Sequence, residues 1–124
     1  MRLNSYRDLK VWQASMELAQ QIYRLTAQFP QQETYGLVSQ IHRAAVSIPS
    51  NIAEGHARGS TREFLHHISI SLGSVAELET QLVLSVKLGY VDAQAVDSIL
   101  LEVDKVGKML RGLQKSLKSR LSHV

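Results

Sequence analysis

A chain of 124 residues that is 44% hydrophobic and 20% charged has the balance of one globular domain, which we expect to span residues 1–124. Cysteine is absent, which excludes disulfides, thiolate nucleophiles, iron–sulfur clusters and cysteine-ligated zinc. No apolar run approaches the ~18 residues of a membrane span, and the first eight residues lack the apolar stretch of a signal peptide. These features predict a cytoplasmic protein that has no membrane partner.

The formal net charge of +3 is unevenly distributed along the chain. From Lys105 onward there are six basic residues and no acidic ones, whereas residues 1–104 carry eight basic and eleven acidic residues. A neutral-to-acidic body with a basic end is typical of a protein that binds a polyanion. Cations near the end of a helix also complement its macrodipole and keep it soluble, so both interpretations stay open.

A first helix is predicted from about Ser5 to Phe29. Its apolar residues recur at steps of three and four, which is the helical period. Pro30 ends the helix, because the residue before a proline is driven out of the α region. The predicted apolar stripe consists of Leu9, Trp12, Met16, Ala19 and Tyr23, with Ile22 beside it.

A second helix is predicted from Thr34 to Gly55, and residues 55–59 are expected to form a loop. Pro49 lies inside the helical pattern, where it removes a backbone donor and clashes with the preceding turn, so we expect a kink or a break there. The helix carries more apolar residues than one stripe can bury, and surplus apolar surface is typical of an interface. These residues are Leu37, Val38, Ile41, Ala44, Ala45, Val46, Ile48 and Ile52.

The third and fourth helices have clear local boundaries. Ser60 and Glu63 have the spacing of a capping box, in which the serine caps the helix and the glutamate reaches back to its amide. Gly89 is expected to end the third helix in a left-handed conformation, and Asp92 is the predicted N-cap of the fourth. Apolar residues follow the helical period in both helices: Phe64, Leu65, Ile68, Leu72, Val75, Leu78, Leu82 and Val86, then the heptad positions Val96, Ile99, Val103, Val106, Leu110, Leu113 and Leu117.

Four helices of this length with short connections predict an all-α fold. We expect an antiparallel up-down-up-down four-helix bundle whose second helix is kinked or broken near Pro49. The common phosphate-loop, dinucleotide, hydrolase-elbow and zinc-protease patterns are missing from the sequence. Glu63 and His66 form one Glu-x-x-His pair, but a di-iron bundle site needs two such pairs and two further glutamates. We therefore predict no metal, no cofactor and no catalytic residue.

Polar residues form a stripe on the second helix, at steps of four, four and three, and share one face if the helix continues through Pro49. Such a stripe is either a solvated outer face or a hydrogen-bonded network, in the core or between subunits, because buried polar groups must be paired. Glu77 belongs to a similar stripe on the third helix. We assign five residues to structure or to a subunit interface: Arg43, Ser47, Asn51, Glu54 and Glu77.

Basic residues form a stripe on the fourth helix, opposite its apolar seam: Lys108, Arg111, Lys115 and Lys118. Arg58 and Arg62 add charge near the start of the third helix, and Arg43 is a further candidate. Because no aromatic residue is interleaved with these cations, base stacking is not predicted. The stripe indicates phosphate contacts of low sequence specificity, or else it only solubilises the helix.

Several stretches of the sequence, in order, resemble the bacterial family of rRNA intervening-sequence proteins. Over residues 6–90 these stretches are YRDLKVWQ (6–13), YGLVSQI (35–41), RAAVSIPSNIAEG (43–55), EF (63–64), GS (73–74), ELETQL (77–82) and LGY (88–90). The one departure is His42, where the family often has a second arginine before Arg43. The fourth helix carries less of the resemblance.

The resemblance implies a four-helix bundle that assembles into a homopentameric ring and is not an enzyme. Its fold is similar to that of accessory variability determinant proteins of diversity-generating retroelements, which bind nucleic acid and a reverse transcriptase. We therefore expect a homo-oligomer that binds RNA or DNA, or a nucleic-acid-processing protein. The alternative is a purely structural or protein-binding scaffold, and a metal-dependent bundle enzyme ranks third.

Overall fold

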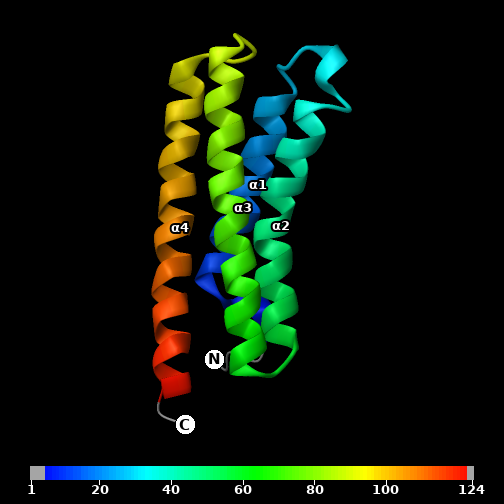
Figure 1. Cartoon of the computed structure of the whole chain (residues 1–124). Helices are drawn as coiled ribbons and strands as arrows, with labels where there is room; N and C mark the ends of the chain where they lie inside the picture. The colour runs from blue at the N-terminus through cyan, green and yellow to red at the C-terminus, as the bar shows by residue number, and fades with distance from the viewer. Residues whose placement is uncertain (1–4, 123–124) are drawn as a thin grey trace.

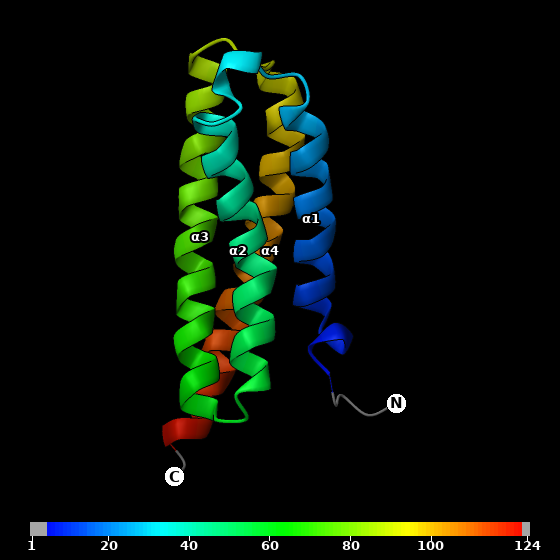
Figure 2. The same cartoon turned by 90° about the vertical axis from the view of Figure 1, so that its right-hand side faces the viewer.

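A computed structural model describes residues 5–122, which form four long α-helices (Figures 1 and 2). The 3₁₀-helix η1 (Tyr6–Asp8) precedes α1 (Lys10–Thr26), and the 3₁₀-helix η2 (Gln31–Glu33) precedes α2 (Leu37–Ala57). They are followed by α3 (Thr61–Lys87) and α4 (Ala93–Ser122). Residues 5–122 contain no strand, so the prediction of an all-α four-helix bundle is confirmed.

Each helix packs against two others and lies diagonally across from the third. The contact between α2 and α3 is the most extensive, that between α1 and α4 is the smallest, and within residues 5–122 the backbones of α2 and α4 do not approach each other. The α1–α2 and α3–α4 connections lie at one end of the bundle and the α2–α3 connection at the other (Figure 1). None of the helices in the described part of the chain combines the length and apolarity needed to cross a membrane.

The first helix is shorter than predicted, and a different face of it is buried. It begins at Lys10, after η1, and ends at Thr26. Its buried apolar residues are Val11, Leu18, Ile22 and Leu25. Within α1, the residues of the predicted stripe each follow a buried residue by one position, so the predicted face is rotated by about 100° around the helix axis from the buried one. Met16 and Tyr23, which belong to the predicted stripe, are therefore 39% and 48% exposed. Both stripes keep the helical period, and the branched aliphatic one packs among the other helices.

The second helix runs without interruption from Leu37 to Ala57, so the predicted break at Pro49 is wrong, while the kink stays a prediction. Gly55 is also not the end of the helix, and the connection to α3 shortens to residues 58–60. A Cβ atom at Gly55 would lie only 2.6 Å from the Cβ atom of His67 on α3. The close approach of α2 and α3 therefore explains why a glycine occupies this position inside the helix.

The surplus of apolar residues on α2 is smaller than expected. Most of them are buried, because α2 packs against both α1 and α3. Val38 is half-buried and Val46 is 42% exposed. The exposed apolar surface of α2 is therefore concentrated around Val46, next to the predicted α1 stripe that includes Met16 and Tyr23.

The predicted ends of α3 are confirmed in all but one detail. Ser60 Oγ accepts a 3.3 Å hydrogen bond from the Glu63 amide, but the Glu63 carboxylate does not reach back and instead lies 3.7 Å from the Arg58 guanidinium. Gly89 has a φ of +76°, and the amides of Gly89 and Tyr90 bond to the carbonyls of Val86 and Ser85. This is the Schellman arrangement, in which a left-handed residue satisfies the last carbonyls of a helix.

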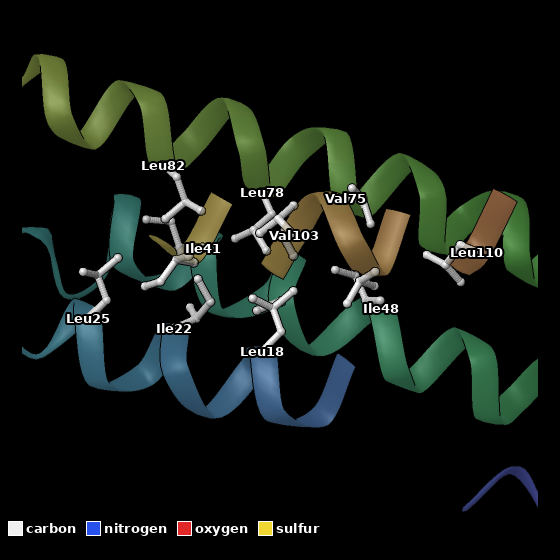
Figure 3. Close-up of a cluster of buried hydrophobic side chains, with 14 of the residues drawn as sticks. Leu18, Ile22, Leu25, Ile41, Ile48, Val75, Leu78, Leu82, Val103 and Leu110 are labelled. Carbon is white, nitrogen blue, oxygen red and sulfur yellow. The ribbon is translucent and has the colours of Figure 1, made fainter. Parts of the chain in front are cut away.

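The hydrophobic core runs along the middle of the bundle and draws on all four helices. Figure 3 shows Leu18 and Ile22 of α1, Ile41 and Ile48 of α2, Leu78 and Leu82 of α3, and Val103 and Leu110 of α4 pointing toward one another. The predicted seam of α4 is buried except for Leu113, which is half-buried. Burial of each such aliphatic side chain stabilises the fold by about 1.5–3 kcal/mol, which holds the polar surfaces described below in place.

Candidate nucleic-acid interface

The basic stripe of α4 lies on the surface of the bundle. Lys108, Arg111, Lys115 and Lys118 are all exposed, and the seam residues on the opposite face of the helix are buried. Lys108 Nζ lies 3.1 Å from Asp104 Oδ2, an exposed pair that is worth about 0.3–0.5 kcal/mol and partly neutralises this lysine. The positive charge of the stripe therefore resides mainly in Arg111, Lys115 and Lys118.

The predicted cations near the start of α3 differ in their surroundings. Arg58 lies between two carboxylates, 2.9 Å from Glu54 Oε2 and 3.7 Å from Glu63 Oε1. Arg62 is exposed, and within residues 5–122 no carboxylate lies within 4 Å of it. Arg62 is thus the better candidate for a phosphate contact, because the charge of Arg58 is already compensated.

One end of the bundle collects basic residues from several elements. The start of α1, the α2–α3 connection and the end of α4 all lie there (Figures 1 and 2). Arg120, which was not singled out from the sequence, lines a hollow of about 200 Å³ together with His56 and Phe64 beside that connection. The 30-residue length of α4 is the signal that could have placed it there. Arg120 therefore joins Arg62, Lys115 and Lys118 at this end.

The opposite end of the bundle carries more acidic than basic side chains near its connections. Glu33 lies in the α1–α2 connection, and Asp92 and Asp97 lie beside the α3–α4 connection at the same end. Arg24 and Lys87 are the basic residues near these connections. The charge of the protein is therefore separated along the long axis of the bundle, which gives its two ends opposite electrostatic character.

A hydrogen-bonded network joins α2 to α3. Asn51 Nδ2 donates to the Ser47 carbonyl at 2.9 Å and to Ser47 Oγ at 3.0 Å, and Ser74 Oγ donates to Ser47 Oγ at 2.8 Å. Because the amide nitrogen of Asn51 is the donor, Asn51 Oδ1 accepts from His67 Nδ1 at 3.0 Å. His67 Nε2 then lies 3.7 Å from Glu54 Oε2. Three residues of the predicted polar stripe thus take part in contacts between the two helices, and His67 was missed.

Arg43 and Glu77 do not take part in that network. Both are exposed and line a hollow of about 580 Å³ together with Gln40 and Ser47, but their charged atoms are not within 4 Å of each other. Gln81 on α3 is buried, and no group among residues 5–122 forms a hydrogen bond with its Oε1 atom. A buried acceptor without a donor is uncommon in a folded chain.

Apolar residues outside the core form a groove between α1 and α2. A hollow of about 350 Å³ is lined by Tyr6 of η1, by part of the predicted α1 stripe and by the facing side of α2: Trp12, Met16, Ala19, Val46, Pro49, Ser50 and Ala53. α3 carries a second apolar area near its end, where Val83, Leu84 and Leu88 are each about 40–50% exposed, and Ile70, more than three turns earlier, is 39% exposed. Within residues 5–122, no group of three or more His, Asp or Glu side chains could hold a metal ion.

Comparisons with known proteins place the chain in a family. A crystal structure of a protein with unknown function from the S23 ribosomal protein family of Bacteroides thetaiotaomicron has 27% sequence identity and a TM-score of 0.76, over 85% of this chain and 98% of that chain. No curated protein matches the sequence. The family model described as 23S rRNA-intervening sequence protein matches residues 7–112. The resemblance noted in the sequence is therefore confirmed, and the chain belongs to the family of 23S rRNA-intervening sequence proteins.

Proposed function

We propose that this protein is a non-enzymatic, bacterial, cytoplasmic homo-oligomer, built from antiparallel up-down-up-down bundles, that binds nucleic acid or a nucleoprotein through phosphate contacts. The observation that supports the proposal is the gathering of exposed cations at one end of the bundle. Arg62, Lys115 and Lys118 are exposed there, and no carboxylate lies within 4 Å of them among residues 5–122. Lysine and arginine that neutralise phosphates release counterions, which gives affinity without sequence specificity.

Two uncovered apolar areas support self-association. One is the groove between α1 and α2, around Met16 and Val46, and the other is the outer side of α3, around Val83 and Leu84. Because the two areas differ, a contact between one area of one copy and the other area of the next would be heterologous, and such contacts close into a ring by rotation. We propose that the ring is the homopentamer that the family resemblance implies.

A salt titration of nucleic-acid binding tests the phosphate contacts. We expect the logarithm of the association constant for a mixed-sequence RNA to fall linearly with the logarithm of the salt concentration. A variant carrying both Lys115→Gln and Lys118→Gln should bind more weakly, with a slope smaller by about 1.5, because two phosphate contacts are lost. The matched control is Lys87→Gln with Arg24→Gln, which removes two exposed cations near the other end of the bundle. Equal slopes for the two double variants would contradict the proposal.

Light scattering tests the oligomer. Met16→Glu places a charge in the groove between α1 and α2, so it should reduce the particle to smaller species. Leu101→Glu is the control, because Leu101 is 72% exposed on α4, outside both apolar areas. A wild-type protein that is monomeric at micromolar concentration would contradict the oligomer.

The second candidate is a scaffold that binds protein rather than nucleic acid. The exposed apolar areas favour it, because a contiguous apolar area is typical of protein-binding surfaces. In this case the basic residues of α4 only complement the helix dipole and solubilise the helix. Nucleic-acid binding that is absent or independent of salt, together with an intact oligomer, would favour the scaffold. Stoichiometric iron, manganese or zinc in the purified protein would instead favour a metal-dependent enzyme.

A further inference from the structure

A hollow of about 550 Å³ lies where α1, the α1–α2 connection and α2 meet. It shares Val46 and Ser50 with the apolar groove, but its lining is different in kind, because it includes aromatic rings, hydroxyl groups and a guanidinium. The residues used below are Tyr23, Tyr35, His42, Arg43, Ser47 and Ser50. They come from three segments that the sequence alone does not bring together.

Two aromatic rings in this hollow present surface to solvent. The Tyr23 ring stacks on the His42 ring with centroids 3.7 Å apart and planes inclined by 14°, and His42 Nε2 is held by Thr26 Oγ1 at 2.7 Å. Tyr23 nevertheless remains 48% exposed. Tyr35, in the connection before α2, is 95% exposed. A flat ring whose position is fixed by a stacking partner, with a second ring nearby, is a surface onto which another planar group can stack.

Arg43 supplies a cation at the edge of the same hollow. It is exposed, and among residues 5–122 no carboxylate lies within 4 Å of it. Glu77, the one carboxylate that lines the neighbouring hollow, is also outside that distance. An unpaired guanidinium is well suited to a phosphate, because its planar set of donors matches two phosphate oxygens. The hydroxyl groups of Ser47 and Ser50 can donate to the same anion or to a sugar.

We propose that this hollow binds one unpaired nucleotide of single-stranded nucleic acid. The base stacks on the exposed ring of Tyr35, beside the Tyr23–His42 pair, and its phosphate binds to Arg43. A duplex does not fit this chemistry, because its bases are already paired and stacked on one another. The inference rests on the proposed function in so far as the ligand is nucleic acid, but it concerns a different surface: the hollow involves α1 and α2, whereas the basic stripe is on α4, diagonally across from α2.

The experiment uses the full chain and a ten-nucleotide RNA with 2-aminopurine at its centre, as a single strand and as a duplex. Stacking on a tyrosine changes the 2-aminopurine fluorescence, so the single strand should show this change on binding and the duplex should not. Tyr35→Leu should remove the fluorescence change and weaken single-strand binding about tenfold, because one base–aromatic stack is lost. Tyr35→Phe should retain both properties. At 95% exposure, Tyr35 can be replaced without disturbing the core.

Arg43→Gln tests the phosphate contact, with Arg24→Gln as the matched control, because Arg24 is an exposed cation on α1 that does not line the hollow. Arg43→Gln should weaken single-strand binding and leave duplex binding unchanged, and Arg24→Gln should alter neither. The proposal is overturned if the wild-type protein binds the single strand without a fluorescence change, or if Tyr35→Leu and Arg43→Gln bind as the wild type does. It is also overturned if these variants change only the oligomer size, which would mean that a second copy covers the hollow.

The outcome is separable from that of the phosphate proposal for α4. If the Lys115→Gln and Lys118→Gln variant retains the wild-type salt slope but Tyr35→Leu abolishes the fluorescence change, the nucleotide site stands and the α4 proposal fails. If the salt slope decreases while Tyr35→Leu behaves as the wild type, the α4 proposal stands and the nucleotide site is wrong.

Discussion

The hydroxyl group of Tyr90 donates a 2.8 Å hydrogen bond to Oε2 of Glu33, a residue 57 positions earlier in the chain. The other carboxylate oxygen of Glu33 accepts a 3.1 Å hydrogen bond from the Leu37 amide, at the start of α2. One side chain therefore satisfies an otherwise unpaired amide of α2 and ties the α3–α4 connection to the α1–α2 connection. The Phe29 ring, 5.9 Å from that of Tyr90, packs at the same place.

Tyr90→Phe should lower the melting temperature, because it removes the hydrogen bond that joins the two connections. The pKa of Tyr90 is raised above its ordinary value of 10.0, first by the hydrogen bond to Glu33, then by burial, and then by the negative charge of Glu33. A raised pKa in the folded state means that the stabilisation is complete below pH ~10 and is lost as the pH rises through the folded pKa. Urea unfolding at pH 8 and pH 11 should therefore show a smaller alkaline loss of stability in Tyr90→Phe than in the wild type. Tyr35→Phe is the control, and it should follow the wild-type curve.

Gly55→Ala should destabilise the fold by about 1–3 kcal/mol, because the added methyl group overpacks the contact between α2 and α3. The new Cβ would lie 2.6 Å from His67 Cβ and 3.1 Å from Phe64 Cδ1. Gly73→Ala is the opposite case, since within residues 5–122 nothing apart from the neighbouring backbone of α3 lies within 4 Å of the Cβ atom that this variant would gain. That variant should stabilise the protein by about 0.5–1 kcal/mol through helix propensity. Urea unfolding measures both changes, and a Gly55→Ala protein as stable as the wild type would show that the helices separate easily.

Asn51→Ala should reduce the free energy of unfolding by about 1–3 kcal/mol, because it leaves the partly buried His67 Nδ1 without its acceptor and removes the hydrogen bonds from Asn51 to Ser47. Ser98→Ala is the control, because the Ser98 hydroxyl is exposed and bonds only to a carbonyl of its own helix. A double-mutant cycle with His67→Ala isolates the coupling between Asn51 and His67. Coupling indistinguishable from zero would mean that the network contributes no stability.

His42 should make the protein less stable in mild acid. Burial lowers the pKa of His42 below its ordinary value of 6.5. The unfolded chain then binds this proton more readily than the folded one, so stability is present above pH ~6.5 and declines as the pH falls through the folded pKa. His42→Gln should show a smaller decline than the wild type between pH 7 and pH 5 in chemical unfolding. His66→Gln, at an exposed histidine, should retain the wild-type decline.

The features that the sequence predicted correctly are those set by local chemistry. The Ser60 cap and the left-handed Gly89 depend on residues within one or two turns, and the α4 seam depends on spacing within one helix; the two ends are confirmed, and the seam is buried except at Leu113. Gly55 was misassigned because the close approach of α3, rather than local conformation, determines why that position is a glycine.

The face of α1 could not be chosen from the sequence, because two adjacent stripes both have the helical period. The stripe with Trp12, Met16 and Tyr23 has the same spacing as the buried one, and packing against the other helices selects between them. The same limit applies to the candidate site. The exposure of the cations on α4 follows from the heptad pattern, whereas the meeting of Tyr23, Tyr35 and Arg43 depends on how α1 is rotated against α2. The sequence argument against base stacking therefore holds only for the α4 stripe.

The separation of charge along the bundle has a consequence for the way the protein meets a polyanion. A body that is positive at one end and negative at the other carries an electric dipole, and the field of a nucleic acid exerts a torque on it before contact. The molecule would therefore approach the nucleic acid with the α2–α3 connection first. In an oligomer whose copies lie side by side and point the same way, the dipoles would add and the whole assembly would rotate together. This alignment acts over a range of about 10 Å at 0.1 M salt and about 30 Å at 0.01 M salt, so orientation on approach depends on ionic strength as strongly as binding does.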